Sequence, residues 1–338
     1  MSARRALAGT LALGLVLLCT PAAAGTVSAE RAAPRPPKVR ARAYVVTDAD
    51  TGAILAAKNA HQRLRPASTL KMLTALTLLP RIDPRSEYRA RRADANVVGS
   101  KVGIVPGQRY RADDLFHGLF LASGNDAAHA LATMAGGLGR TVRLMQRMAD
   151  HLNARDTTVA NPSGLDARDQ YSSAYDLALI ARAGLARADF RGYCSTVRAQ
   201  FPGQGGKTYQ IQNQNDLLYG YRGAVGVKTG YTTKAGHTFV GAAERGGRTL
   251  LVTLLDGPTD VSQATATLLD WGFATPKTVR PVGTLAESGP PPDAHRATPT
   301  PQPAAGAAAP RGDPLGLASG PLRWIWGLAI VIVAVAAA

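Results

Sequence analysis

Short apolar segments flank clusters of turn residues near both ends of the central part of the chain, which predicts β-hairpins there. The first hairpin is expected over residues 43–57, with two strands around the turn Asp48-Ala49-Asp50-Thr51-Gly52. The second is expected over residues 238–255, where Gly246 and Gly247 separate two apolar runs. Both patterns predict pairs of antiparallel strands.

Between these hairpins the apolar positions follow the 3.6-residue period of an α-helix. A helix is expected to begin at Ser68, after Pro66, and to continue through Leu76. The same period predicts helices over 113–122, 126–134, 141–152 and 261–271. Strands at both ends with helices inserted between them predict an α+β fold, with one mostly antiparallel sheet flanked by helices plus a helical lobe.

The N-terminal segment differs from this central part. Arg4 and Arg5 precede an unbroken apolar run over residues 6–19, and Pro21 and three alanines follow it. This layout predicts a cleaved signal peptide over residues 1–25. An uncleaved anchor is less favoured, because a membrane-spanning helix needs about 20 apolar residues.

The C-terminal part also differs. Proline, alanine, glycine and threonine dominate residues 287–320, which predicts a disordered linker. Trp324 and Trp326 then introduce an uncharged apolar run, which predicts a membrane segment over 322–338. The run is about 22 Å long as a helix, against a bilayer core of about 30 Å, and no Lys or Arg follows it. Either the segment is truncated or it only enters the bilayer. Residues 39–275 remain as one domain of ordinary enzyme size.

Charge and composition exclude several functions. The net charge of +16 first suggests nucleic-acid binding, but an exported protein does not meet nucleic acid, and its basic residues are scattered. We therefore expect no nucleic-acid partner. Cys194 is the one cysteine outside the signal segment and is expected to be a buried hydrophobe. The histidines are dispersed and no Gly-x-Ser-x-Gly elbow occurs, so we expect neither a metal site nor a Ser-His-Asp esterase.

Three short motifs point to a specific chemistry. They are Ser68-Thr69-Leu70-Lys71, Ser123-Gly124-Asn125 and Lys228-Thr229-Gly230, in this order along the chain. Each alone is common, but the ordered set is specific.

Ser68 and Lys71 are three residues apart and share one helix face, so the amine can reach the hydroxyl. An ordinary lysine has a pKa of about 10.4, and about 4 kcal/mol must act against its cation before it becomes a base at neutral pH. Burial and the second cation, Lys228, are the expected causes.

The motifs resemble those of the serine-type D-Ala-D-Ala carboxypeptidases, the low-molecular-mass penicillin-binding proteins, over residues 40–273. Further segments fit the same family: Pro66-Ala67-Ser68, Asn125-Asp126-Ala127-Ala128, Asn161-Pro162-Ser163-Gly164-Leu165, Asn213 with Asn215, and Gly226-Val227-Lys228-Thr229-Gly230-Tyr231-Thr232. The resemblance implies an α/β fold, more narrowly α+β, of the serine β-lactamase and penicillin-binding transpeptidase type.

The resemblance also implies roles for the motif residues. The catalytic residues are Ser68 as the acylated nucleophile, Lys71 as its general base, and Ser123, which with Asn125 relays a proton or orients the substrate. The substrate-binding residues are Asn125, Lys228, Thr229, Gly230 and Tyr231, and the backbone N–H groups of Ser68 and Tyr231 form the oxyanion hole. The implied substrate is the peptidoglycan stem peptide, with β-lactams as covalent inhibitors and no metal or cofactor. The enzyme would work on the extracytoplasmic face of the membrane, with a C-terminal anchor.

Two departures from the family pattern qualify these roles. Many relatives carry an arginine shortly before the last helix that helps to hold the terminal carboxylate, whereas this stretch reads Pro258-Thr259-Asp260-Val261-Ser262-Gln263. Arg248 is the candidate substitute. In addition, the linker takes the place of the C-terminal β-rich domain of some relatives.

Two alternatives to the carboxypeptidase stay open. A serine β-lactamase needs a base for fast deacylation, usually a glutamate in the loop after the second motif, and residues 161–176 contain no glutamate. A wall-binding protein with an inactive site is the other alternative, and the presence of every motif residue disfavours it.

Overall fold

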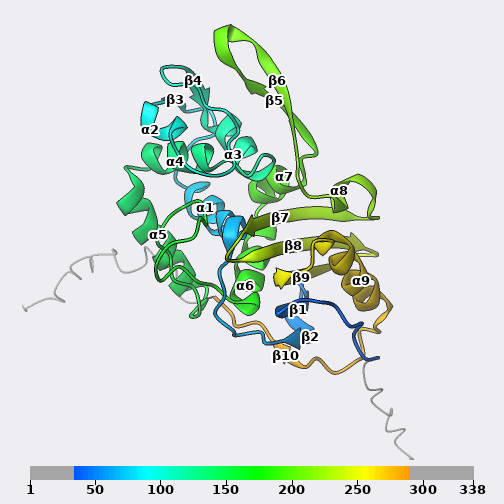
Figure 1. Cartoon of the computed structure of the whole chain (residues 1–338). Coiled ribbons are helices and arrows are strands. Elements are labelled where there is room, and N and C mark those ends of the chain that lie inside the picture. The colour runs from blue at the N-terminus through cyan, green and yellow to red at the C-terminus, as the bar shows by residue number, and fades with distance from the viewer. Residues whose placement is uncertain (1–33, 289–338) are drawn as a thin grey trace, which may run out of the picture. The chain divides into compact units, whose positions relative to one another are not determined.

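An antiparallel sheet of six strands crosses the part of the chain that the computed structural model describes, residues 34–288 (Figure 1). The strands lie in the order β10-β2-β1-β9-β8-β7. Their bounds are β1 Ala43–Asp48, β2 Ala53–Lys58, β7 Ala224–Thr232, β8 Gly236–Arg245, β9 Arg248–Gly257 and β10 Gly283–Thr284. Both predicted hairpins are therefore confirmed, as β1–β2 and β8–β9.

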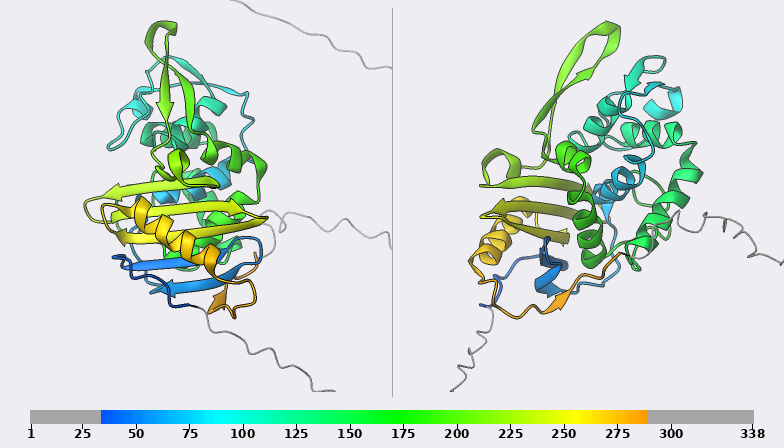
Figure 2. Two further views of the ribbon diagram at one scale, coloured as in Figure 1. Left: turned by 90° about the vertical axis from the view of Figure 1, so that its right-hand side faces the viewer. Right: turned by 180° about the vertical axis from the view of Figure 1, so that it is seen from behind.

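The two hairpins join through the pairing of β1 with β9, from Ala43 opposite Leu255 to Asp48 opposite Leu250. All six residues of β1 are buried, as are the first eight of β9. Strands that are buried on both faces need helices on both sides. Figure 2 shows this arrangement, with α9 on one face of the sheet and α6 with α1 on the other.

The helices on the two faces enclose separate apolar cores. On one side α9, Val261–Ala274, packs Leu268 and Leu269 against Val252 and Leu254 of β9. The larger core lies on the other side. It is built by α1 Lys71–Leu78, α3 Ala112–Phe120, α4 Asn125–Met134, α5 Leu138–His151, α6 Ala174–Leu185 and α7 Ala188–Ser195.

Shorter elements complete the described fold. Among them α2, Arg92–Ala95, and the ribbon formed by β3 Glu87–Arg89 and β4 Arg109–Arg111 lie on the helical lobe. A second ribbon, β5 Arg198–Pro202 with β6 Thr208–Gln212, projects at the top of Figure 1. The remaining elements are the 3-10 turns η1 Ala67–Leu70 and η2 Gln204–Gly206, and the short helix α8 Leu217–Gly220.

Four of the five predicted helices agree with the structure to within three residues, as α3, α4, α5 and α9. The fifth differs at its start. Ser68 lies in the 3-10 turn η1, and the α-helix begins only at Lys71. Leu70 and Lys71 have ψ values of −20° and −19°, which are typical of a 3-10 helix, and Ala67 before them has a positive φ of 47°. The nucleophile candidate therefore lies on a tight turn that leads into the helix.

The chain beyond residue 275 still packs on the domain. Leu285 is 2% exposed, Val279 is buried, and β10 pairs with β2. Nothing in the described residues tests the predicted bounds of 39–275, which stay a prediction. The predicted signal peptide, the membrane segment and all but the first two residues of the linker lie outside the described residues. Between residues 34 and 288, no helix combines the length and the apolar character that crossing a membrane requires.

Candidate active site

The amine of Lys71 lies at the centre of three polar contacts. Its Nζ is 2.9 Å from Ser68 Oγ, 2.7 Å from Asn125 Oδ1 and 2.7 Å from the carbonyl oxygen of Ser163. A neutral amine keeps two N–H bonds and one lone pair. The two carbonyl oxygens accept the N–H bonds, so the lone pair remains for the O–H of Ser68. The geometry therefore suits removal of the Ser68 proton.

The electrostatic surroundings favour this neutral form. Lys71 is completely buried. Burial lowers the pKa of Lys71 well below its ordinary value, and the nearby charge of Lys228 lowers it further, while Asp126 acts in the opposite direction. Burial also lowers the pKa of Lys228, to about 7. No carboxylate hydrogen-bonds to Lys71 in the described part of the chain, so its cation has no neutralising contact.

The second motif forms the start of α4. Ser123 is buried with a positive φ of 55°, and Asn125 is the first residue of the helix. The Asn125 side chain is fixed at both ends, because its Nδ2 donates to the carbonyl oxygen of Val98 at 2.6 Å while its Oδ1 accepts from Lys71. This arrangement sets the orientation of the amide at the site.

Asp126 is a positioning residue for which the motifs gave no role. Its carboxylate accepts hydrogen bonds from the backbone N–H groups of Val102, Gly103 and Ile104 at 2.8–3.1 Å. It therefore ties the loop before β4 to the start of α4. The sequence signal was its place directly after Ser123-Gly124-Asn125.

The third motif lies on an edge of the sheet. Lys228, Thr229 and Gly230 belong to β7, which pairs with β8 on one side and ends the six-stranded sheet on the other. Lys228 points into the protein and is 1% exposed, whereas Tyr231 is 59% exposed. An edge strand leaves backbone N–H and C=O groups free to bind an extended peptide.

Gly230 brings this strand against the nucleophile turn. A Cβ atom at Gly230 would lie 2.8 Å from the backbone nitrogen of Ser68 and 3.0 Å from that of Thr69. Thr238, opposite Gly230 on β8, donates a hydrogen bond to the carbonyl oxygen of Pro66 at 2.9 Å. The absence of a side chain at Gly230 therefore lets the first and third motifs meet.

The loop of residues 161–165 closes the site from the remaining side. Asn161 Oδ1 accepts from the backbone nitrogens of Ser163 and Gly164, which bends the loop so that the Ser163 carbonyl faces Lys71. Gly164 has a φ of 80°, and a Cβ there would lie 1.9 Å from the carbonyl oxygen of Ala67. Sequence reasoning quoted this segment as a family resemblance but gave it no role in holding the base.

The structure thus brings Ser68, Lys71, Asn125 and the Lys228–Gly230 strand together, and the roles of Ser123 and Tyr231 stay predictions. The suggestion that Arg248 replaces the missing arginine of the family at the site is wrong. On β9 it lies nine residues from Gly257, which pairs with His237 beside Tyr231, so the two ends are about 30 Å apart. Its guanidinium instead binds Asp48 and two backbone carbonyls.

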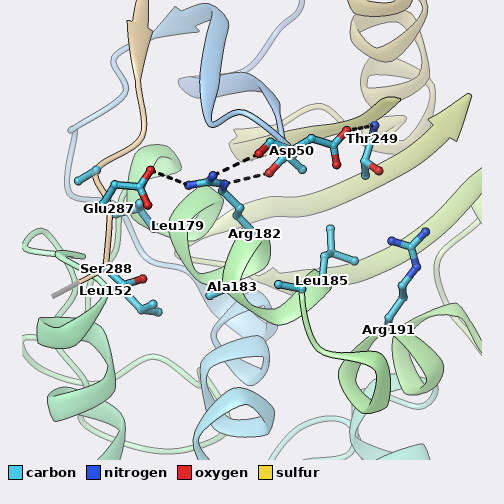
Figure 3. A pocket seen from close by; sticks show the side chains of 13 residues that line it. Asp50, Leu152, Leu179, Arg182, Ala183, Leu185, Arg191, Thr249, Glu287 and Ser288 are labelled. Carbon is cyan, nitrogen blue, oxygen red and sulfur yellow. Dashed lines mark hydrogen bonds and ion pairs between the residues drawn. The ribbon is translucent and has the colours of Figure 1, made fainter. Parts of the chain in front are cut away.

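Cys194 and a surface hollow beside Arg182 lie apart from this chemistry. Cys194 is fully buried and burial raises its pKa to about 12, which agrees with a packed hydrophobe. Figure 3 shows the hollow, about 400 Å³, where Arg182 of α6 contacts the turn at Asp50 and the side chain of Glu287. None of the motif residues lines it. Between residues 34 and 288, no three His, Cys, Asp or Glu side chains gather as a metal site.

Comparison with known proteins gives consistent matches. The family model described as D-alanyl-D-alanine carboxypeptidase matches residues 30–259. The chain is 44% identical over 242 residues to the D-alanyl-D-alanine carboxypeptidase DacB2 of Mycobacterium tuberculosis, covering 69% of this chain and 82% of that protein. It is 30% identical to DacF of Bacillus subtilis, covering 69% of this chain but only 62% of that longer protein.

Solved structures agree in fold. A crystal structure of D-alanyl-D-alanine carboxypeptidase from Mycobacterium tuberculosis has a TM-score of 0.71 and 42% identity, covering 75% of this chain and 98% of that one. A mutant of a Streptomyces DD-transpeptidase has a TM-score of 0.68 and 28% identity, covering 70% and 99%. The predicted α+β fold of the penicillin-binding type is confirmed. On these matches, the chain belongs to the D-alanyl-D-alanine carboxypeptidase family of serine peptidases.

Proposed function

We propose that this protein is a D-alanyl-D-alanine carboxypeptidase that removes the terminal D-Ala of peptidoglycan stem peptides through an acyl-enzyme on Ser68. β-Lactams would acylate the same serine. The observation that carries the proposal is the 2.9 Å contact between Ser68 Oγ and the fully buried amine of Lys71. A buried amine with a lowered pKa can take a proton at neutral pH.

In the proposed acylation step, the Lys71 amine takes the Ser68 proton while Oγ attacks the carbonyl carbon of the penultimate D-Ala. The negative charge that develops on the carbonyl oxygen faces the backbone N–H groups of Ser68 and Tyr231. The C–N bond then breaks, and the proton passes from Lys71, with Ser123 as relay, to the leaving amine of the terminal D-Ala. In the second half of the reaction, water loses a proton to Lys71 and attacks the acyl carbon. The bond to Ser68 Oγ then breaks, and Oγ takes the proton back, which restores the hydroxyl.

Substrate binding in this proposal uses the edge of β7. An extended peptide backbone pairs with the free side of residues 229–231. Thr229 and the amine of Lys228 bind the terminal carboxylate, since Lys228 Nζ lies 2.9 Å from the Thr229 carbonyl oxygen and 3.5 Å from its hydroxyl. Gly230 allows this strand to approach the nucleophile. The Asn125 amide orients the substrate from the opposite side.

The alternatives receive no support from the site. The loop that faces Lys71 supplies the Ser163 carbonyl oxygen and contains no glutamate to activate water, as a fast β-lactamase would need. An inactive wall-binding protein does not account for a buried lysine in contact with a serine hydroxyl, because burying an unneutralised amine destabilises the fold.

We further propose that the enzyme works outside the cytoplasm, exported by residues 1–25 and held at the membrane by residues 322–338. The composition of both segments and the wall substrate of the family support this. A full-length protein is expected in the membrane fraction of the producing cell, and a version ending at residue 288 in the soluble exported fraction. Equal distribution of the two versions would contradict the anchor.

The catalytic proposal is tested with a fluorescent penicillin and a pentapeptide ending in D-Ala-D-Ala. The wild-type protein should be labelled covalently and should release free D-alanine. Ser68→Ala should lose both signals, whereas the surface control Ser195→Ala should keep them. Label on Ser68→Ala would overturn the nucleophile assignment, and labelling without D-alanine release would overturn the carboxypeptidase assignment.

A further inference from the structure

The helix α5 carries a row of three arginines on its outer side. Arg140, Arg143 and Arg147 are all exposed, and their spacing of three and four residues places them on one helix face. Figure 1 shows α5 at the outer edge of the helical lobe. The opposite face of α5 packs Met145 and Ala149 into the larger core. The basic face is therefore the one that remains for an external partner.

The arginines of this row have no neutralising partner. None of the three forms an ion pair or a side-chain hydrogen bond within residues 34–288. Asp150 is the only acidic residue of α5, and it accepts a hydrogen bond from the Gln146 amide at 3.0 Å. At the start of α7, by contrast, Arg187 pairs with Asp189 at 2.6 Å. The positive charge on the outer side of α5 is thus left uncompensated by the fold.

Such a row destabilises the helix that carries it. Arg140 and Arg143 are an i,i+3 pair, and Arg143 and Arg147 are an i,i+4 pair. Like charges at these spacings repel each other on a helix, and negative charges placed against the row would remove the repulsion. The row extends for about 10 Å along the helix axis. It therefore fits an extended anionic surface rather than one small anion.

The described part of the chain ends beside this helix. Asn153, just after α5, donates a hydrogen bond from Nδ2 to the carbonyl oxygen of Glu287 at 2.7 Å. Leu285, two residues earlier, is 2% exposed and fixes the segment on the domain. Figure 3 shows Glu287 and Ser288 next to Leu152, the residue that follows α5. The residues after 288 therefore start from the C-terminal end of α5.

This exit point gives the row a specific partner. In the proposed anchoring, residues 289–321 link the domain to the membrane segment 322–338. A flexible chain of this length has a mean end-to-end distance of about 30 Å, which keeps α5 near the membrane at an effective concentration of about a millimolar. Each arginine beside an anionic membrane favours the docked state by about fivefold, so three of them together contribute about 100-fold.

We propose that α5 docks the catalytic domain on anionic phospholipid headgroups, with Arg140, Arg143 and Arg147 facing the lipid phosphates. Guanidinium groups suit this partner, because each can donate two parallel hydrogen bonds to one phosphate. The row follows the helix axis, so the docked helix lies along the membrane surface. The domain then has a defined orientation on the membrane instead of turning freely on its linker. This inference rests on the proposed membrane anchor.

The test follows the distance between α5 and the lipid headgroups in the chain from residue 26 to residue 338. Gly139→Cys supplies a dye site on α5, since a Cβ there meets only the Arg143 guanidinium, at 3.6 Å, and Cys194 is fully buried. The protein is placed in phosphatidylcholine vesicles with or without anionic phosphatidylglycerol. Energy transfer from the dye to a headgroup-labelled lipid should be high only on the anionic vesicles. Salt at about 1 M should abolish it, because the screening length falls to about 3 Å.

A triple variant shows whether the row is responsible. Arg140→Gln, Arg143→Gln and Arg147→Gln combined should lower the ratio of docked to undocked domain on anionic vesicles about 100-fold. Its energy transfer should then match that on neutral vesicles. These side chains are exposed and lie outside the catalytic site, so penicillin should label the variant at the wild-type rate. Unchanged transfer in the triple variant would overturn the role of the row.

The matched control removes three other exposed cations, Arg222, Lys277 and Arg280, which form no ion pair in the described part of the chain. Lys277 and Arg280 follow α9, which covers the face of the sheet opposite α1 and α6 (Figure 2). Changing the three to Gln removes the same charge and should leave the energy transfer at the wild-type level. Equal losses in the two triple variants would overturn docking through α5 and indicate attraction by net charge alone.

The remaining outcomes separate the docking from the anchor on which it rests. If the protein floats with neither kind of vesicle, the anchor fails and the docking fails with it. If it floats with both kinds and the transfer is equal, the docking fails while the anchor stands. A soluble glycerol-phosphate polymer that cancels the transfer at the same phosphate concentration would overturn the membrane as the partner and indicate an anionic wall polymer instead.

Discussion

Two buried basic side chains, Arg248 on β9 and Lys71 on α1, are held in different ways. Arg248 is 6% exposed, and its guanidinium bonds to the Asp48 carboxylate at 2.8 Å and to the carbonyl oxygens of Gly272 and Thr275. Lys71 is fully buried among neutral oxygen atoms, with the Lys228 amine as a second cation nearby. Arg248 has a carboxylate partner and Lys71 has none among its hydrogen-bond partners.

The difference separates a structural charge from a reactive one. A carboxylate beside a buried cation stabilises the charged form, and Arg248 uses this to join the N-terminal hairpin to the end of α9. The absence of a carboxylate beside Lys71 destabilises its charged form, which is the condition for a base at neutral pH. The two residue types fit these roles, because arginine stays protonated whereas lysine can lose its proton.

The largest effect is expected when lysine and arginine are exchanged at these two positions. Lys71→Arg should keep the fold but lower the rate of Ser68 acylation by about 10²–10⁴-fold, because a guanidinium cannot accept the proton. The rate is measured with a fluorescent penicillin on protein whose folding is checked by circular dichroism. Arg248→Lys is the reciprocal control and should acylate at the wild-type rate. A Lys71→Arg rate near wild type would show that another group is the base.

Removing the structural cation should affect stability instead of chemistry. Arg248→Met leaves the buried Asp48 carboxylate without its partner, so we expect a loss of about 3–5 kcal/mol in the free energy of unfolding. Urea unfolding measures the loss, and Asp48→Asn in the same chain should restore part of it. The folded fraction should still be labelled by penicillin at the wild-type rate. A loss of stability below about 1 kcal/mol would mean that the pair is not buried as described.

A smaller loss of acylation rate is expected when β7 is pushed away from the turn that carries Ser68. Gly230→Ala places a methyl group against the backbone nitrogens of Ser68 and Thr69, so the strand or the turn must shift. A displacement of about 1 Å can lower a rate about 100-fold, and we expect a loss of acylation of up to that size. Gly220→Ala is the control, since a Cβ there meets no atom within 4 Å. Equal rates for the two variants would contradict the close approach.

The lowered pKa of Lys228 predicts that the stability of the fold depends on pH. Burial lowers the pKa of Lys228 to about 7, whereas an unfolded lysine titrates near 10.4. Between these values the unfolded state binds more protons, so stability should rise with pH by at most about 1.4 kcal/mol per pH unit. Lys228→Met should remove this contribution from pH 7 to pH 10. Parallel curves of unfolding free energy against pH for the two proteins would contradict it.

Sequence reasoning predicted the local parts of this structure best. The hairpins β1–β2 and β8–β9 consist of apolar segments around clear turn residues, and the helix α5 has a strong helical period. The ribbon β5–β6 and the helix α6 were not predicted. In β5–β6 polar and apolar residues do alternate, as in Thr208-Tyr209-Gln210-Ile211-Gln212, but each strand is only five residues long and is a weak signal. The helix α6 is buried nearly all round, which hides a one-sided helical pattern.

At the site, sequence could predict which side chains act but not which backbone atoms hold them. The spacing of Ser68 and Lys71 indicated their contact, because it depends on one turn of chain. The Ser163 carbonyl could not be found in this way, since a backbone oxygen leaves no mark in the residue type. Arg248 was misjudged because its distance from the site depends on strand direction, which only the pairing of β8 with β9 fixes.

The most direct test of an unneutralised base is the pH dependence of the second-order rate constant for acylation of Ser68 by a penicillin. This profile reports the pKa of the base in the free enzyme. We predict that the rate rises with pH through a midpoint well below the ordinary lysine value of about 10.4, and that Lys228→Met moves the midpoint upward because a neighbouring cation is lost. A midpoint near 10 in the wild-type protein, unchanged in Lys228→Met, would contradict the account.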